Sequence, residues 1–282
     1  TSQRGWKPDI FTHLKPSEVQ LLSDFMKTFP VIDIKHHSAE IKSIYFKQIE
    51  PDIYPGQFFN VWLPGVDEKP FSVSDVFQGI MEITVKAVGP FTRALVAVER
   101  GDFIGLRGPF GTHFTFHHHA LLVGGGMGIV PLRYLARMLR QQGFHFEILL
   151  GARCEKEIPF QNDFSEWAPT TFVTEDGSLG YQGQVTEYIH EKIRESKLSF
   201  IYSAGPEAML IRVMEEAKKA GLNYEISFER YMKCGIGICG QCVVNGSGIR
   251  LCKEGPVLSR NMAETVTEWG IPHRDATGKR KV

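Results

Sequence analysis

Two patterns of hydrophobic and polar positions divide the chain near residue 117. Between Val31 and Phe116, short segments such as IKSIYFK, GQFFNVWLP and IMEITVKAV alternate or run apolar between Gly, Pro and Asp residues. Several short strands at this spacing predict a closed antiparallel barrel. After His119, apolar runs are each followed by an amphipathic stretch, as in ALLVGGG before IVPLRYLARMLRQQG. That alternation predicts a parallel sheet flanked by helices, so the fold class is an all-β domain joined to an α/β domain.

The two ends of the chain differ from this body. In residues 1–31, Leu22, Phe25, Met26 and Phe29 lie at helical spacing, which predicts a short helix that packs on the body or an arm that docks on a partner. The last twenty residues are polar and end in the basic stretch GKRKV. The expected parts are an N-terminal helical extension (1–31), a β-barrel (32–116), an α/β domain (117–227), a cysteine-rich segment (228–262) and a polar tail (263–282).

Composition narrows the class of protein. The chain has 282 residues, of which 43% are hydrophobic, and this is enough for two domains with buried cores. The 32 Lys and Arg residues balance 32 Asp and Glu residues, so no net field attracts nucleic acid or an anionic membrane. No apolar run approaches the roughly 20 residues that span a bilayer, and the first residues do not have the layout of a signal peptide. We expect a cytoplasmic protein that binds neither nucleic acid nor membrane.

Four of the five cysteines are close together in sequence. Cys234, Cys239, Cys242 and Cys252 follow the pattern C-x4-C-x2-C-x9-C. Reducing compartments disfavour disulfides, so clustered cysteines there indicate a metal site. Zinc and a [2Fe–2S] cluster both accept four thiolates, but structural zinc sites usually have two short C-x2-C pairs, whereas this spacing is that of plant-type ferredoxins. We predict an iron–sulfur cluster, with zinc or unligated thiols as alternatives, and we expect the isolated Cys154 to be an ordinary small residue.

The residues between these cysteines support the cluster. Gly235, Gly237 and Gly240 permit the left-handed dihedrals that a loop needs to aim its N–H groups at sulfur atoms. Asn245-Gly246 is a hairpin turn signal between the third and fourth cysteines. A hairpin there would fold the fourth cysteine back toward the other three.

A glycine-rich turn joins the strand ALLV to the helix that follows it. Gly124, Gly125, Gly126 and Gly128 would let a pyrophosphate reach N–H groups at the positive end of that helix. The sequence departs from the strict G-x-G-x-x-G fingerprint, so a merely tight turn is the alternative. The pair Gly205-Pro206 follows another strand of the parallel type, and loops at the carboxyl ends of such strands converge on one crevice. The two sites together predict a nucleotide-binding site.

These motifs, together with KPFSVS and VGPFTRAL in the predicted barrel, resemble the ferredoxin–NADP reductase superfamily. The chain is most similar to the iron–sulfur flavoprotein electron-transfer subunits of NAD-dependent dihydroorotate dehydrogenase, an enzyme of pyrimidine biosynthesis. The resemblance implies FAD in the barrel, NAD(P)H as the substrate of the α/β domain and a [2Fe–2S] cluster in the cysteine-rich segment. It also implies a hetero-oligomer in which electrons pass between an FMN-bearing catalytic subunit and NAD(H).

The resemblance also implies roles for individual residues. The stretch Lys69-Pro70-Phe71-Ser72 corresponds to a flavin motif of the form R-P-x-S, which places Lys69 near the FAD pyrophosphate, Phe71 against the flavin ring and Ser72 at the ring edge. Lysine departs from the arginine of the family, because an ammonium group cannot make a bidentate phosphate contact. The other residues implied in cofactor binding are Thr84, Val85, Lys86, Gly89 and Thr92 for FAD, and Pro131 and Asp176, with the glycine sites above, for the nicotinamide nucleotide.

Several questions stay open at this point. Cofactors carry hydride and one-electron chemistry, so we expect no catalytic side chain. The run His117–His119 is expected to be a solvated linker rather than a metal site. Arg153 is either a surface residue or a contact for a 2′-phosphate, which leaves the choice between NADH and NADPH undecided. The same domains also serve sulfide dehydrogenases, NADH-dependent ferredoxin:NADP+ oxidoreductases and diaphorase subunits of soluble hydrogenases, and a zinc-bearing module that is not an enzyme is a remote alternative.

Overall fold

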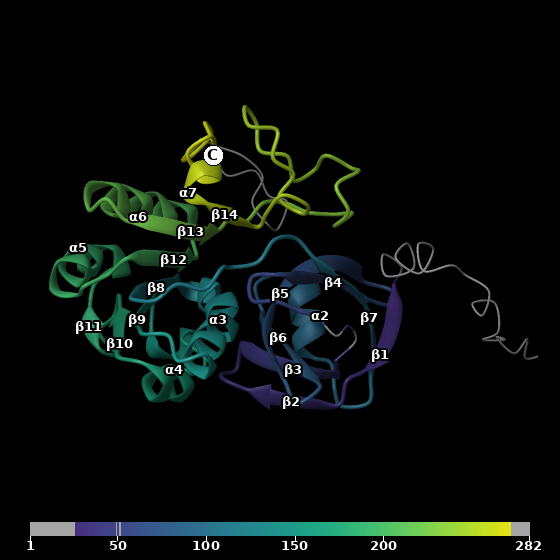
Figure 1. The fold of residues 1–282 in the computed structure, drawn as a ribbon. Helices are drawn as coiled ribbons and strands as arrows, with labels where there is room; N and C mark the ends of the chain where they lie inside the picture. Colours follow the sequence, from purple (N-terminus) through teal and green to yellow (C-terminus); the bar gives the residue numbers. More distant parts are fainter. Residues whose placement is uncertain (1–25, 49, 51, 272–282) are drawn as a thin grey trace, which may run out of the picture.

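The computed structural model describes residues 26–271, except residues 49 and 51. Within these ranges the chain forms two seven-stranded sheets that lie side by side, with the cysteine-rich segment above their junction (Figure 1). Most of the predicted N-terminal helix and most of the polar tail lie outside the described residues. None of the helices in these ranges combines the length and the apolar character that crossing a membrane requires.

The first sheet is antiparallel throughout and curves into the predicted barrel. Its order is β1-β7-β4-β5-β6-β3-β2. The strands are β1 (Lys27–Pro30), β2 (Asp33–His36), β3 (Ile41–Lys47), β4 (Phe58–Leu63), β5 (Asp67–Phe77), β6 (Ile80–Lys86) and β7 (Phe103–Phe110). Apolar side chains that alternate along these strands fill the interior, where Phe46, Phe59 and Ile83 are 1% exposed.

Strand β1 differs from the prediction. The helical spacing assigned Phe29 to an N-terminal helix, but Lys27–Pro30 pairs antiparallel with β7, Lys27 opposite Leu106. The free edge of β7 offers a row of backbone hydrogen-bonding groups, and pairing there overrides a weak local helix preference. The barrel therefore begins a few residues earlier than the sequence indicated.

A short helix, α2 (Pro90–Val96), closes one end of the barrel. Pro90 opens the helix, where its missing N–H removes no hydrogen bond. Leu95 is fully buried against the barrel interior. The buried Lys42 ammonium group donates to the Val96 carbonyl at 2.9 Å and to the Val98 carbonyl, which satisfies acceptors at the end of the helix.

The second sheet is parallel except for its last strand and has the order β11-β10-β9-β8-β12-β13-β14. Its strands are β8 (Ala120–Gly125), β9 (Phe146–Ala152), β10 (Thr170–Thr174), β11 (Tyr181–Gln182), β12 (Phe200–Ala204), β13 (Asn223–Ser227) and β14 (Val257–Ser259). Its helices are η2 (Gly126–Gly128), α3 (Ile129–Gln141), η3 (Glu155–Glu157), α4 (Gln161–Trp167), α5 (Val185–Glu195), α6 (Glu207–Lys219) and α7 (Arg260–Ala263).

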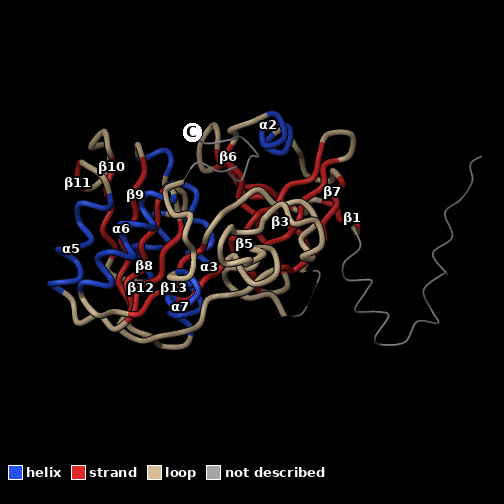
Figure 2. The backbone as a smooth tube through the Cα atoms, turned by 90° about the horizontal axis from the view of Figure 1, so that it is seen from above, coloured by secondary structure: helices blue, strands red, loops and turns tan. Residues whose placement is uncertain are grey.

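Helices cover both faces of this sheet, as the sequence predicted. The apolar sides of α5 and α6 pack on one face with Leu121, Leu149 and Ile201, while α3 and α4 pack on the other face with Leu122 and Ile148. Helix α3 also lies against β5, so it stands between the two sheets (Figure 2). Helix α3 thereby packs on both the α/β sheet and the barrel.

The cysteine-rich segment leaves β13 and returns to the sheet as β14. Between them the chain runs mostly in turns, and the predicted hairpin is present: Val243 bridges Arg250, and the Val244 N–H donates to the Ile249 carbonyl at 2.8 Å. The segment thus projects from the edge of the parallel sheet over the mouth of the barrel (Figure 1).

Candidate functional site

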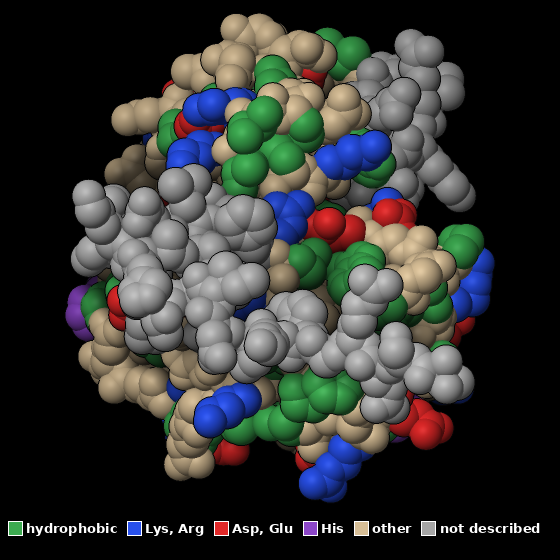
Figure 3. Space-filling model, turned by 90° about the vertical axis from the view of Figure 1, so that its right-hand side faces the viewer, with side chains coloured by type: hydrophobic (Ala, Val, Ile, Leu, Met, Phe, Trp, Pro, Cys, Tyr) green, Lys and Arg blue, Asp and Glu red, His purple; other side chains and the backbone are tan. Residues whose placement is uncertain are grey.

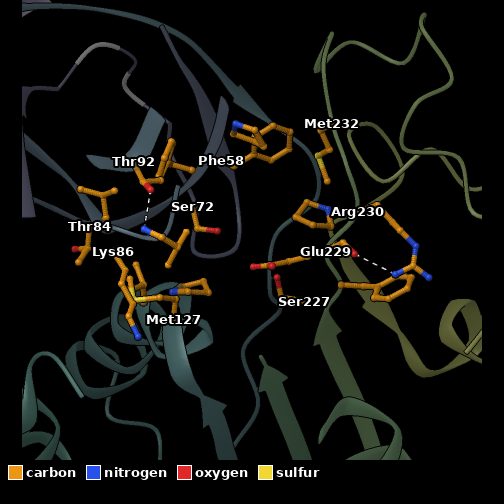
Figure 4. Close-up of a pocket in the computed structure, with 18 residues that line it drawn as sticks. Phe58, Ser72, Thr84, Lys86, Thr92, Met127, Ser227, Glu229, Arg230 and Met232 are labelled. Carbon is orange, nitrogen blue, oxygen red and sulfur yellow. Dashed lines mark hydrogen bonds between the residues drawn. The ribbon is translucent and has the colours of Figure 1, made fainter. Parts of the chain in front are cut away.

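A cavity of about 260 Å³ lies where the barrel, the α/β domain and the C-terminal segment meet. In Figure 4, Ser72, Thr84 and Thr92 of the barrel lie on one side of it, and Ser227 and Glu229 at the end of β13 lie on the other. The full lining is Phe58, Pro70, Phe71, Ser72, Thr84, Val85, Lys86, Val88, Thr92, Met127, Val130, Pro131, Ser227, Phe228, Glu229, Arg230, Met232 and Pro256.

The barrel wall combines a flat apolar surface with fixed hydroxyl groups. The rings of Phe71 and Phe91 stack with their centroids 6.0 Å apart. The Thr92 hydroxyl accepts the Val88 and Gly89 N–H groups at 2.8 and 2.9 Å, which holds the turn before α2 in place. A planar aromatic ligand with a polar edge fits such a wall, because stacking and a few directed hydrogen bonds are the usual means of holding one.

Most residues that the sequence assigned to the flavin line this cavity. Pro70, Phe71, Ser72, Thr84, Val85, Lys86 and Thr92 do so, and Gly89 belongs to the turn that Thr92 holds. Lys69 is outside the lining: its ammonium group lies 2.7 Å from Asp67 Oδ2 and 5.5 Å from the centre of the Tyr231 ring. Its contact with a pyrophosphate stays a prediction.

A second cavity, of about 470 Å³, lies at the carboxyl ends of the parallel strands. It is lined by Gly125 at the end of β8 and Gly126 after it, by Arg153 after β9, by Glu175 after β10 and by Pro206 after β12. The sequence predicted that the glycine turn and Gly205-Pro206 converge, and the structure brings them together: a Cβ atom at Gly205 would lie 3.0 Å from the backbone of Gly125.

Close packing explains the glycines of the turn. A Cβ atom at Gly128 would lie 2.2 Å from the carbonyl oxygen of Ala204, which is backbone and cannot move aside. At Gly124 it would lie 2.8 Å from the Leu150 side chain. Gly128 lets the start of α3 approach β12, and Gly124 leaves room for Leu150 and the side chains of α3, while Gly125 and Gly126 form the cavity wall.

Both arginines that line the second cavity form ion pairs. Arg153 pairs with Glu157, whose carboxylate also lies 2.8 Å from the Lys86 ammonium group. Burial opposes ionisation of Glu157, but the hydrogen bonds from Arg153 and Lys86 outweigh it and lower the pKa of this carboxyl. Arg212 pairs with Glu215 at 2.6 Å. Lys86 lines the first cavity and Glu157 the second, so their ion pair links the two.

Asp176 lies outside both linings. Its carboxylate accepts hydrogen bonds from the Ser178 hydroxyl and N–H at 2.6 and 2.9 Å, and these bonds lower its pKa. Its predicted contact with a nicotinamide nucleotide stays a prediction. Of the three linker histidines, His118 and His119 are exposed, while His117 is half-buried and stacks on Phe200 at 3.9 Å.

The cysteine loop directs N–H groups at sulfur atoms. The Gly237 N–H donates to Cys252 Sγ at 3.2 Å, the Ile238 N–H to Cys234 Sγ at 3.4 Å, and the Cys252 N–H to Cys242 Sγ at 3.4 Å. Gly237 has φ +80°, a left-handed conformation that L side chains rarely adopt. Such bonds stabilise thiolate charge, which is what metal ligation requires.

The thiol pKa values reflect this environment. Burial opposes ionisation of Cys234, but N–H donation from Cys239 and Ile238 outweighs it and lowers the Cys234 pKa to about 7. Hydrogen bonding with Cys252 lowers the pKa of Cys242 to about 6, and the same interaction raises that of Cys252.

Backbone hydrogen bonds link neighbouring cysteines: the Cys239 N–H donates to Cys234 Sγ at 3.5 Å and the Cys252 N–H to Cys242 Sγ at 3.4 Å. In the part of the chain that the structure describes, no three His, Cys, Asp or Glu side chains are placed to hold one metal ion. A structural zinc needs four ligands around one ion, whereas the two irons of a [2Fe–2S] cluster share four cysteines. The four cysteines supply the complete thiolate donor set that a [2Fe–2S] cluster needs.

Sequence reasoning missed the residues that close the first cavity from the side of the cysteine segment. Arg230 is 4% exposed, lies 3.9 Å from the centre of the Phe228 ring and pairs with Glu207 and Glu268 at 3.1 and 3.3 Å. Met232 lines the cavity two residues before the first cysteine of the loop. The sequence around Arg230, SFERYMK, mixes charged and aromatic residues and carries no pattern that would assign this role.

Comparisons with known proteins agree with this arrangement. The sequence model of the iron–sulfur cluster binding domain of dihydroorotate dehydrogenase B matches residues 229–262. The chain is 41% identical over 230 residues to the probable dihydroorotate dehydrogenase B (NAD(+)) electron transfer subunit of Methanocaldococcus jannaschii, covering 81% of this chain and 88% of that protein. It is 35% identical over 267 residues to the protein of the same name from Methanothermobacter thermautotrophicus, covering 91% and 98%.

Solved structures share the fold. A structure of an NADH-dependent reduced ferredoxin–NADP oxidoreductase superposes with a TM-score of 0.75 at 26% identity, covering 83% of this chain and 88% of that one. A ferredoxin NADP+ reductase from Neisseria gonorrhoeae with bound FAD and NADP superposes with a TM-score of 0.60 at 17% identity, covering 70% and 92%. The second likeness concerns the fold alone.

Proposed function

Because the chain belongs to the family of dihydroorotate dehydrogenase B electron transfer subunits, we propose that it carries electrons between a dihydroorotate-oxidising partner subunit and NAD(H). The cofactors are FAD in the barrel and a [2Fe–2S] cluster in the cysteine-rich segment. Flavin chemistry, which takes two electrons together and releases them singly, supplies the link between a hydride and a one-electron cluster.

The observation that supports this most directly is one cavity lined by all three parts of the chain. Ser72 and Thr92 come from the barrel, Pro131 from the start of α3, and Met232 from the approach to Cys234. A reaction that joins a nicotinamide, a flavin and a cluster needs all three near one point. The cavity meets that requirement with residues that lie far apart in sequence.

The residues of this chain then have binding and orienting roles. Phe71 offers a ring face to the flavin and Ser72 a hydroxyl to its edge, while Thr92 fixes the turn at Gly89. Gly125 and Gly126 expose backbone N–H groups to a pyrophosphate in the second cavity. The proposed electron transfer requires no side chain that acts as a general acid or base.

The partner is a catalytic subunit, which we propose bears FMN. Electron transfer to it requires the cluster to lie near the surface of contact. Hydrophobic side chains gather over the cysteine-rich segment beside Lys and Arg side chains (Figure 3), and Ile238, between Cys234 and Cys239, is 79% exposed. Exposed apolar surface of this kind is typical of a docking site.

The test begins with the chain purified alone under anaerobic conditions. We expect one FAD and about two irons and two sulfides per chain, as one [2Fe–2S] cluster requires, and reduction of artificial dyes by NADH without oxidation of dihydroorotate. Co-purification with the catalytic subunit should add dihydroorotate:NAD+ activity. The change Cys239→Ser should remove the iron–sulfur signal in electron paramagnetic resonance, and the matched Cys154→Ser should keep it. Stoichiometric zinc, or dihydroorotate turnover by the single chain, would contradict the proposal.

A second candidate is supported by the superposition with the NADH-dependent reduced ferredoxin–NADP oxidoreductase. Its sequence identity of 26% is well below the 41% of the methanogen relative, so we place it second. The two candidates share cofactors and differ in partner. A tagged pull-down from the native host decides between them: an FMN-bearing partner with dihydroorotate activity supports the first, and a partner that reduces NADP+ from ferredoxin supports the second.

A further inference from the structure

Two polar side chains of the barrel, Asn60 and Arg107, contact the first residues of the cysteine loop, and a third, Glu68, contacts both of them. Asn60 lies on β4, Glu68 on β5 and Arg107 on β7, and β4 lies between the other two strands. Asn60 is directly opposite Arg107 in the sheet register. Asn60, Glu68 and Arg107 are called the barrel clamp below.

The barrel clamp holds two consecutive carbonyl groups of the loop. The Arg107 guanidinium donates to the Cys234 carbonyl and, at 3.1 Å, to the Lys233 carbonyl. The Asn60 amide donates to the same Lys233 carbonyl at 2.8 Å. One carbonyl thus receives two donors from the barrel, and the next, on the first cysteine, receives a charged one.

Glu68 fixes the two donors. Its Oε1 accepts from the Arg107 Nε at 2.7 Å and from the Asn60 amide at 2.7 Å. The two donors are shielded from solvent, since Asn60 is 1% exposed and the Arg107 side chain 13%, while the Glu68 side chain is 30% exposed. The planar guanidinium of Arg107 donates hydrogen bonds to Glu68 from one edge and to the loop carbonyls from the other. An ammonium group cannot reproduce this geometry.

Packing reinforces the contact. The ring of Phe110 lies beside Gly235, where a Cβ atom would be 2.7 Å from the ring, and Arg107 lies 5.5 Å from the centre of the same ring. Phe110 also contacts Phe58, which lines the first cavity. The loop is therefore seated on residues that continue directly into the cavity wall.

The barrel clamp differs in kind from the N–H···S bonds of the loop. Those bonds join residues of the cysteine segment to one another, whereas the barrel clamp joins the segment to the barrel. The first kind shapes a cluster site, and the second sets where that site lies relative to the cavity. Electron transfer depends on that placement, because small displacements of reacting groups carry large rate penalties.

We propose that Arg107, held by Glu68 and Asn60, is a positioning residue that fixes the Cys234 end of the cluster loop against the flavin cavity. This rests on the proposed function, since it takes the cysteine segment to hold a [2Fe–2S] cluster. Arg107 touches neither cofactor in the proposal and acts through the backbone of Lys233 and Cys234.

The decisive comparison is Arg107→Gln against Arg250→Gln. Arg250 also donates to a carbonyl of the loop, that of Gly237 at 3.1 Å, but it belongs to the cysteine segment and pairs with Glu254. Both changes remove one guanidinium from the loop, and only the first breaks a bond to the barrel. Arg107→Lys keeps the charge without the fork and should rescue in part.

Two readouts are made on each protein loaded with its cofactors. Hydrogen exchange of residues 233–237 should speed up in Arg107→Gln and stay near wild type in Arg250→Gln. The second readout is rapid mixing with NADH, which is oxidised to NAD+ and gives up two electrons. The flavin absorbance should bleach at the wild-type rate in both variants. Acceptance of one electron by the cluster should slow about tenfold in Arg107→Gln alone.

Equal slowing in both variants, or a wild-type rate in Arg107→Gln, would overturn the proposal. If Arg107→Gln does not fold, Glu68→Gln keeps the side-chain shape and should slow cluster reduction in the same direction by a smaller factor. Wild-type rates in both Glu68→Gln and Arg107→Lys would then count against it. Iron content and the electron paramagnetic resonance signal of the unmodified chain test the proposed function separately. If the unmodified chain lacks a cluster, the proposed function is wrong. If it holds a cluster but the change at Arg107 does not alter the rate of cluster reduction, only this inference is wrong.

Discussion

One buried arginine, Arg133, makes several of the ion pairs between the two domains, and its removal should be costly. Arg133 of α3 lies 2.8 Å from Glu82 and 3.2 Å from Asp75 of the barrel, and 2.7 Å from Asp163 of α4. Its side chain is 11% exposed and that of Glu82 only 4%. Burial works against the charge on Arg133, but the surrounding carboxylates, Glu82 foremost, outweigh it and raise the arginine pKa.

The magnitude for Arg133→Met follows from what is left behind. Asp75 keeps a partner, because Arg137 lies 2.6 Å away, and Asp163 is 28% exposed and can be hydrated. Glu82 loses its cation in a buried place, and breaking a buried pair costs about 3–5 kcal/mol. At about 2–4 °C per kcal/mol for domains approaching this size, the melting temperature should fall by roughly 10 °C.

The assay is thermal unfolding followed by circular dichroism, with two companion variants. Arg140→Met removes an arginine from the same helix whose side chain is 44% exposed and pairs with Glu166 at 3.6 Å, so it should cost no more than about 1 kcal/mol. Adding Glu82→Gln to Arg133→Met should restore part of the loss, because it removes the stranded charge. If Arg133→Met is no more harmful than Arg140→Met, or the double variant is less stable than the single, the reasoning is wrong.

Three further changes have defined outcomes. Gly128→Ala places a methyl group 2.2 Å from the Ala204 carbonyl oxygen and should cost about 1–3 kcal/mol by thermal unfolding while raising the KM for NADH. Burial, and to a smaller extent the charge of Lys35, lower the His37 pKa from 6.5 to about 4. The unfolded chain therefore takes up this proton first as pH falls, and stability decreases between about pH 6.5 and pH 4. The change His37→Gln should flatten that part of a profile of melting temperature against pH. Glu157→Gln frees Arg153 for a 2′-phosphate and should raise kcat/KM for NADPH about tenfold, measured beside NADH, whereas an unchanged ratio would exclude Arg153 from nucleotide choice.

The parts of the fold with a strong local period could be predicted from sequence. The stretch beginning at Ile129 has apolar residues at helical spacing, and the structure has a helix at Ile129–Gln141. The strand before it is apolar at every position because both faces are covered by helices. The cysteine spacing is likewise a local feature of the sequence. The turn signal at Asn245-Gly246 correctly predicted a hairpin that places Cys252 beside Cys242.

Contacts between distant segments could not be predicted in this way. Asn60 and Lys233 are 173 positions apart in the sequence. The alternation of apolar and polar residues along β4 does not indicate that the Asn60 side chain binds a distant loop. Strand β1 was assigned to a helix because its partner β7 is invisible to a local pattern. Lys69 occupies the motif position for a phosphate contact, yet Asp67 two residues earlier binds its ammonium group, a competition that the motif does not encode.

Arg133 and Arg107 each fix a different part of the chain to the barrel, so their removal should affect different steps of electron transfer. Arg133 and Arg137 fix α3, whose first turn lines the first cavity with Val130 and Pro131, to β5 and β6. Arg107 fixes the cysteine loop to β4, β5 and β7. Loosening the first contact should disturb the step between nicotinamide and flavin, because it moves the nucleotide domain. Loosening the second should spare that step and slow the one that follows, so the order of electron transfer can be read from which arginine is changed.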